Sequence, residues 1–94
     1  MNKDRFYGII FGLAVADALG APIEFEPINE RQEIKAMNDA KEKYGVLPGL
    51  WTDDTIMTLL LLESLLKKGG FDANHQLTLY QRWFDEGYMS PTGN

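Results

Sequence analysis

The chain has 94 residues, 9 Lys and Arg against 14 Asp and Glu for a net charge of −5, and no cysteine. This length suits one small domain and excludes a two-domain enzyme within the chain. The acidic balance lacks the basic surface that nucleic-acid binding needs, so no nucleic-acid partner is expected, and no basic cluster suggests a membrane partner. Absence of cysteine excludes disulfides and fits a cytoplasmic location.

The hydrophobic pattern predicts helices and no strand. The first helix covers residues 2–19 and ends at Gly20, two residues before Pro22. Gly8, Gly12 and Ala16 stand four residues apart on one face, where small side chains let another helix approach closely. A signal peptide is the alternative for this apolar start, which Asp4 and the two glycines disfavour.

Three more helices follow. A mostly charged helix is expected at residues 30–43, then helices at 52–68 and at 73–86. Gly69 ends the third helix, while Asp72 caps the fourth and Gly87 ends it. The apolar stripe expected along the fourth helix consists of Leu77, Tyr80, Trp83 and Phe84.

The helix at 52–68 carries apolar residues in nearly every direction around its axis. Such a helix needs cover on all sides, and three other small helices could hardly supply it. The pattern therefore predicts either self-association or a larger helical bundle whose C-terminal portion is missing from this chain.

The start of that helix holds the densest group of polar side chains, Thr52, Asp53, Asp54 and Thr55 after Trp51. Carboxylate and hydroxyl oxygens are ligands for Mg²⁺, Mn²⁺ or Ca²⁺ rather than zinc. The alternative is structural: Thr52 caps the helix, and the two acids answer its dipole.

Two further acids and one histidine need an explanation. Asp17 ends an apolar helix where a negative charge opposes the dipole, which predicts a stabilising hydrogen bond. Glu24 lies between Ile23 and a phenylalanine in a proline-containing loop, a setting that suits a general acid or base, although a solvated loop residue is the simpler alternative. His75 is expected to have a surface or capping role.

These residues resemble the ADP-ribosylglycohydrolase family. The resemblance rests on FGLAVADALGAPIEF at residues 11–25, WTDDTIM at 51–57, GFD at 70–72 and residues 83–93, so it covers essentially the whole chain. One departure is Ala16, where the family commonly has glycine.

The resemblance implies the N-terminal helices of a larger all-α bundle that cleaves the glycosidic bond between ADP-ribose and a protein or small-molecule acceptor. It implies two Mg²⁺ ions, with Mn²⁺ as an alternative. By matching positions, Thr52, Asp53 and Asp54 are metal ligands, Glu24 is the catalytic glutamate, and Asp17 and Thr55 support the ligands.

The family's second ligand set, Asp-x-Asp followed by Ser or Thr, is absent from this chain. Residues 1–94 are thus expected to be the N-terminal segment of one domain, truncated at the C-terminus and inactive alone. The alternative function is a non-catalytic helical module that oligomerises or binds a partner through the helix at 52–68.

Overall fold

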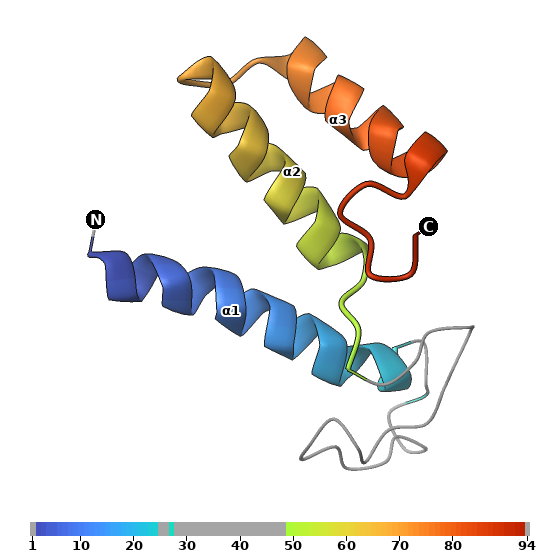
Figure 1. The fold of residues 1–94 in the computed structure, drawn as a ribbon. Helices are drawn as coiled ribbons and strands as arrows, with labels where there is room; N and C mark the ends of the chain where they lie inside the picture. The colour runs from blue at the N-terminus through green and yellow to red at the C-terminus, as the bar shows by residue number, and fades with distance from the viewer. Residues whose placement is uncertain (1, 25–26, 28–48, 94) are drawn as a thin grey trace. The chain divides into compact units, whose positions relative to one another are not determined.

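The computed structural model describes residues 2–24, 27 and 49–93. These residues form three α-helices and one short 3₁₀ helix, so the predicted all-α class is confirmed (Figure 1). The helix predicted at residues 30–43 lies outside the described residues. Contacts divide the chain into two compact units, Met1–Thr52 and Asp53–Asn94, and each unit is described by itself.

The first unit is built on helix α1, Lys3–Gly20. Asn2 caps it, because the Asn2 side chain accepts a hydrogen bond of 2.8 Å from the backbone N–H of Asp4. The 3₁₀ helix η1, Ala21–Ile23, follows directly and contains a proline in its first turn. The predicted helix is confirmed, with both boundaries shifted by one residue.

Most of the apolar surface of α1 is uncovered. Its only buried residue is Ala18, whereas Tyr7, Ile9, Phe11 and Val15 are each more than half exposed. A methyl group added at Gly8 or Gly12 would meet no atom within 4 Å, so the close helix contact predicted there is not found among the described residues. By length and composition Lys3–Ile23 could cross a membrane, but core helices and signal sequences pass the same test.

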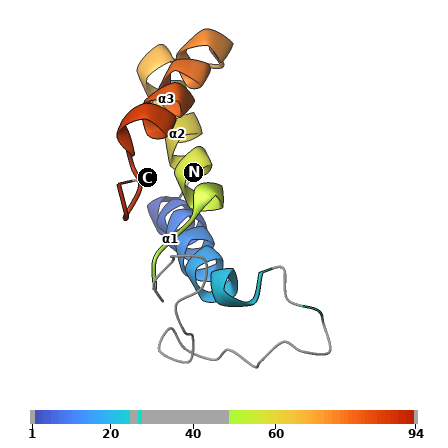
Figure 2. The same ribbon diagram turned by 90° about the vertical axis from the view of Figure 1, so that its right-hand side faces the viewer.

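The second unit is a pair of helices, α2 (Asp53–Lys68) and α3 (Ala73–Glu86), which lie side by side (Figures 1 and 2). Gly69 follows α2 with a φ of 70°, in the left-handed region that favours glycine. Asp72 caps α3 by accepting a hydrogen bond from the His75 N–H, and Gly87 ends it with a φ of 70°. The predicted bounds of the fourth helix and both its caps are confirmed.

The core of this unit consists of Ile56, Leu60 and Leu79, with Tyr80, Trp83 and Tyr88 packed against it. Two members of the predicted stripe are outside it: Leu77 is 61% exposed and Phe84 is 83% exposed. At about 100° per residue, Leu77 and Phe84 lie about 20° apart on one face of α3, Leu79 and Trp83 lie about 40° apart on another, and Tyr80 lies between the two faces. The side of α3 that carries Leu79, Tyr80 and Trp83 packs on the core residues of α2, so the predicted stripe is half wrong.

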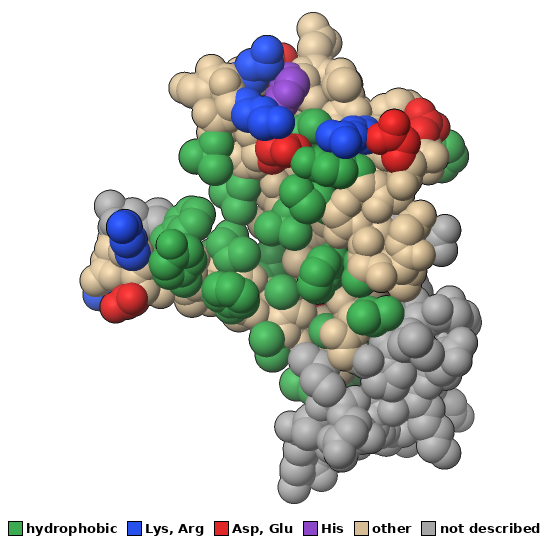
Figure 3. Space-filling view, in the orientation of Figure 1, with side chains coloured by type: hydrophobic (Ala, Val, Ile, Leu, Met, Phe, Trp, Pro, Cys, Tyr) green, Lys and Arg blue, Asp and Glu red, His purple; other side chains and the backbone are tan. Residues whose placement is uncertain are grey.

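Helix α2 is buried along one face only in the part of the chain that the structure describes. Its buried residues are Thr55, Ile56, Leu60 and Ser64. Met57 and Leu66 are 41% and 78% exposed, and Figure 3 shows hydrophobic side chains at the surface of the molecule. The cover expected on all sides of this helix is therefore not supplied by the described residues.

Candidate functional site

The C-terminal half of α1 holds Asp17, and its carboxylate binds Thr52 through both oxygens. The backbone N–H of Thr52 donates to Asp17 Oδ2 at 2.8 Å, and the Thr52 hydroxyl donates to Oδ1 at 2.5 Å. Both residues are partly buried. The hydrogen bond predicted for Asp17 is thus confirmed, and it joins two residues that are 35 positions apart in the chain.

Thr52 stands directly before α2, at the position where a threonine usually caps a helix by accepting an N–H hydrogen bond. Its hydroxyl donates its proton to Asp17 Oδ1. Donation of the proton leaves the lone pairs of the Thr52 oxygen for either role, the helix cap or the metal ligand.

Asp53 and Asp54 form the start of α2, and both are exposed. Neither carboxylate makes a hydrogen bond or an ion pair with the residues that the structure describes. Their charges suit the positive end of the helix dipole, which explains why two acids are tolerated in one turn. Because both carboxylates are exposed, burial of their charge creates no need for a cation.

Glu24 follows η1 in extended backbone, with its N–H donating to the carbonyl of Ala21 at 3.2 Å. Its side chain is exposed. The structure thus matches the alternative of a solvated loop residue. Thr55, the other predicted supporting residue, is 2% exposed in the first turn of α2.

No three His, Asp or Glu side chains come together over residues 2–24, 27 and 49–93. The candidate ligands in this region are the hydroxyl of Thr52 and the carboxylates of its two sequence neighbours. A divalent cation takes six or more oxygen ligands, so these three side chains supply part of a coordination shell.

A second polar cluster, which sequence reasoning missed, joins α2 to the segment after α3. The Tyr88 hydroxyl donates to Glu63 Oε1 at 2.6 Å, and Lys67 Nζ lies 3.3 Å from the same oxygen. Tyr88 holds the pKa of Glu63 below its ordinary value, burial opposes this, and Lys67 reinforces it. The same hydrogen bond, with burial second, raises the pKa of Tyr88.

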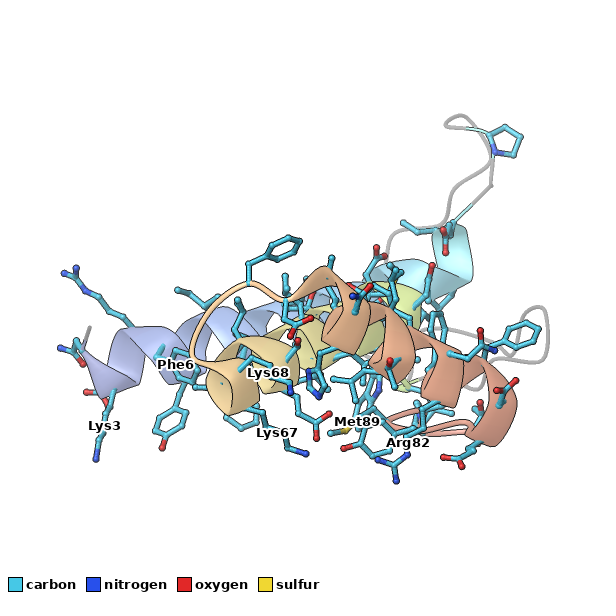
Figure 4. All side chains as sticks on the ribbon, turned by 90° about the horizontal axis from the view of Figure 1, so that it is seen from above. Lys3, Phe6, Lys67, Lys68, Arg82 and Met89 are labelled. Atoms are coloured by element: carbon cyan, nitrogen blue, oxygen red, sulfur yellow. The ribbon has the colours of Figure 1, made fainter. Side chains whose placement is uncertain are left out.

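Arg82 completes this cluster from α3, and Figure 4 labels it with Lys67 and Met89. Its guanidinium lies 3.8 Å from the centre of the Tyr88 ring and bonds Glu86 at 2.8 Å. The contact with Glu86 raises the pKa of Arg82. No spacing in the sequence relates Glu63 to Tyr88, so the sequence alone could not predict that these side chains are in contact.

His75 has a capping role through its backbone and a packing role through its ring. Its Nδ1 lies 2.8 Å from the hydroxyl of Ser64, which is 1% exposed on α2. This contact gives the buried Ser64 hydroxyl a hydrogen-bond partner and links α2 to α3. The prediction of a surface or capping role is correct for the backbone, but the bond to Ser64 was not foreseen.

The sequence matches a family model described as ADP-ribosylglycohydrolase over residues 1–94. It is 34% identical over 90 residues to ADP-ribosylarginine hydrolase Tri1 of Pseudomonas putida, covering 96% of this chain and 24% of that protein. It is 35% identical to the protein of the same name from Serratia proteamaculans, covering 98% of this chain and 25% of that protein.

A third relative is the ADP-ribosyl-[dinitrogen reductase] glycohydrolase of Rhodospirillum rubrum, 43% identical over 72 residues that make up 73% of this chain and 24% of that protein. No solved structure matches the chain significantly. The chain spans about a quarter of the length of the curated relatives it matches. Since the family model covers every residue, the chain belongs to the ADP-ribosylglycohydrolase family.

Proposed function

We propose that this chain is the N-terminal segment of a Mg²⁺-dependent hydrolase that cleaves the glycosidic bond between ADP-ribose and an acceptor. The family match and the names of three relatives support the reaction class. Those names specify ADP-ribosylarginine and ADP-ribosylated dinitrogen reductase, so an ADP-ribosylated protein is the substrate class that we propose.

The observation that carries the proposal is that oxygen atoms able to bind a metal lie at the start of α2. Asp53 and Asp54 are exposed, and neither carboxylate makes a hydrogen bond or an ion pair with other described residues. Thr52, their sequence neighbour, has its hydroxyl proton engaged by Asp17, which leaves lone pairs on its oxygen. Two carboxylates and one hydroxyl are oxygen donors of the kind that Mg²⁺ binds, with Mn²⁺ as an alternative.

When bound, divalent cations would polarise oxygen atoms and orient water or substrate hydroxyls. Thr52, Asp53 and Asp54 would hold the first ion, and Asp17 and Thr55 would support them from α1 and from the first turn of α2. Glu24, exposed at the end of η1, would accept or deliver a proton near the scissile bond. We propose that the remaining ligands come from a part of the family domain that this chain does not contain, so that residues 1–94 are inactive alone.

The test is hydrolysis by the complete protein that the gene encodes. The substrate is a protein mono-ADP-ribosylated on arginine, and the released ADP-ribose is measured with Mg²⁺ present or chelated. We expect activity only with Mg²⁺, and a loss of about 100-fold or more in Asp53→Asn/Asp54→Asn, since ligand loss exceeds the effect of losing a supporting residue.

The matched control is Asp85→Asn, which removes one exposed acid from a helix of the same unit. It should leave the rate of hydrolysis unchanged. A protein that hydrolyses the substrate equally well with chelator, or a double variant as active as the control, would overturn the assignment of Mg²⁺ to these residues.

One observation favours the non-catalytic module as a second candidate: Leu66 of α2 is 78% exposed and Met57 is 41% exposed. If these side chains are covered by a second copy of the chain, residues 1–94 will sediment as a dimer at micromolar concentration. Leu66→Lys would then give a monomer. If wild-type residues 1–94 are monomeric, self-association does not explain the apolar surface of α2. Contact with the rest of the family domain is then the explanation that we propose.

A further inference from the structure

We infer that the outer face of α3 is a docking seam for one helix from the part of the family domain that this chain does not contain. The seam consists of Ala73, Leu77, Tyr80 and Phe84. The inference rests on the proposed function only where that takes residues 1–94 to be the N-terminal segment of a longer hydrolase.

The spacing of the seam suits contact with a single helix. Its four residues are four, three and four positions apart, and at about 100° per residue they fall within a strip about 60° wide. Side chains at this spacing interlock with those of one neighbouring helix. The core of the unit lies on another side of α3, at Leu79 and Trp83. Helix α3 therefore has two apolar sides, one for α2 and one for a further element.

The seam is open to solvent in the part of the chain that the structure describes. Phe84 is 83% exposed and Leu77 is 61% exposed, and Ala73 is exposed as well. An open hollow on this side of α3 is lined by Leu77, Tyr80, Gln81 and Phe84. The strip carries no charged side chain, so a helix laid along it would bury no unpaired charge of α3.

Area and charge both disfavour a second copy of the chain as the occupant. Helix α3 has 14 residues and is about 21 Å long, so a seam about 10 Å wide offers roughly 200 Å² to a partner. A stable interface buries about 800 Å² on each partner. Each copy also carries a net charge of −5, so two copies repel each other.

A helix from the absent part of the family domain is free of both objections. The chain is matched over 96% and 98% of its length but spans only 24% and 25% of two relatives, so about three quarters of each relative lies outside the match. A helix from that part belongs to the same polypeptide, so its local concentration is high and a small seam suffices. Its shape follows from the seam: a large side chain fits opposite Ala73, and a small one fits opposite Phe84.

The test compares side-chain reactivity in residues 1–94 with that in the complete protein that the gene encodes. Residues 1–94 contain no cysteine, so Leu77→Cys and Phe84→Cys each place one thiol of this segment in the seam. Thr78→Cys is the matched control, because Thr78 is exposed on α3 at least about 100° away from every seam residue. Labelling by a maleimide is followed by mass spectrometry of the peptide that contains the substituted residue.

The expected result is protection of the seam in the complete protein alone. In residues 1–94 the three thiols should react at rates within about 3-fold of one another. In the complete protein the two seam thiols should react at least about 100-fold more slowly, while the Thr78→Cys thiol should change by less than about 3-fold. Hydroxyl-radical footprinting of Leu77 and Phe84 in both wild-type proteins makes the same comparison without a substitution and should show the same protection.

The outcomes separate this inference from the proposed function. Equal reactivity of the seam in both proteins overturns the inference, even where the complete protein hydrolyses its substrate with Mg²⁺. Equal protection of the Thr78→Cys thiol overturns it as well, because the cover is then not specific to the seam. Protection that is present in residues 1–94 and disappears on dilution also overturns it, since a second copy then covers the seam. Seam protection in a complete protein that lacks Mg²⁺-dependent hydrolysis supports the inference, and the proposed function fails alone.

Discussion

Replacing Tyr88 by phenylalanine tests the cluster that fastens the segment after α3 to α2. The change removes the hydroxyl that donates to Glu63 Oε1 at 2.6 Å. Among the described residues, Glu63 is 17% exposed and would keep its ion pair with Lys67, which is 61% exposed, while its Oε2 is already buried with no partner. Hydrogen bonds to charged groups are worth about 1.5–3 kcal/mol, and water can reach part of this carboxylate. We therefore expect Tyr88→Phe to lower the free energy of unfolding by about 1.5 kcal/mol.

The pH dependence of this loss follows from two opposite pKa shifts. The pKa of Glu63 is lowered from 4.5, so its contribution is present above that value and is lost as the pH falls through the lowered pKa. The pKa of Tyr88 is raised from 10.0, so its contribution is present below that value and is lost as the pH rises through the raised pKa. The difference between wild type and Tyr88→Phe should be constant from about pH 5 to pH 9 and shrink on both sides.

The assay is urea unfolding of residues 1–94, followed by circular dichroism at several pH values. Tyr7→Phe is the matched control, because it removes a hydroxyl from a side chain that is 54% exposed and has no hydrogen bond among the described residues. It should change the free energy of unfolding by less than about 0.5 kcal/mol. A loss in Tyr88→Phe no larger than in Tyr7→Phe, or one that does not vary between about pH 3 and pH 7, would refute the reasoning.

Two substitutions test the packing of the second unit by thermal unfolding. Leu60→Ala removes a side chain with 0% exposure from the core between α2 and α3, and should lower the free energy of unfolding by about 3 kcal/mol, whereas Leu66→Ala, at 78% exposure, should change it by less than about 0.5 kcal/mol. Equal effects of the two would contradict the assigned core. Gly87→Ala places a methyl group against the backbone of Gly93 at a φ of 70° and should destabilise by about 2 kcal/mol, whereas Gly70→Ala, with ordinary φ and no atom within 4 Å, should not destabilise. A harmless Gly87→Ala would show that the turn after α3 differs from the one described.

Local signals explain which elements could be predicted. The bounds of α3 follow from Asp72 and Gly87, because a capping carboxylate and a left-handed glycine act within a few residues of the helix ends. The Asp17 hydrogen bond was expected from the helix dipole, but its partner could not be named. Thr52 lies 35 residues further on, and pairing at that separation depends on the path of the chain between them.

The buried face of α3 shows a second feature that could not be predicted from the sequence. Apolar side chains occur on two faces of this helix, and periodicity alone does not tell which face meets α2. The structure places Leu79 in the core and leaves Phe84 83% exposed, although both are large and apolar. Residues of the candidate site were proposed from their resemblance to a family motif. The cluster of Glu63, Lys67, Arg82 and Tyr88 brings together side chains from three segments that share no motif, so the sequence did not indicate it.

The positions of the two tryptophans have a practical consequence for spectroscopy. The chain holds only Trp51 and Trp83, one in each compact unit. Trp83 packs against the core of the second unit, and Trp51 is 36% exposed directly before Thr52. Trp51→Phe and Trp83→Phe therefore give two proteins with a single tryptophan each. One emits from the neighbourhood of the candidate ligands and the other from the helix pair, so the units can be followed separately without any attached label.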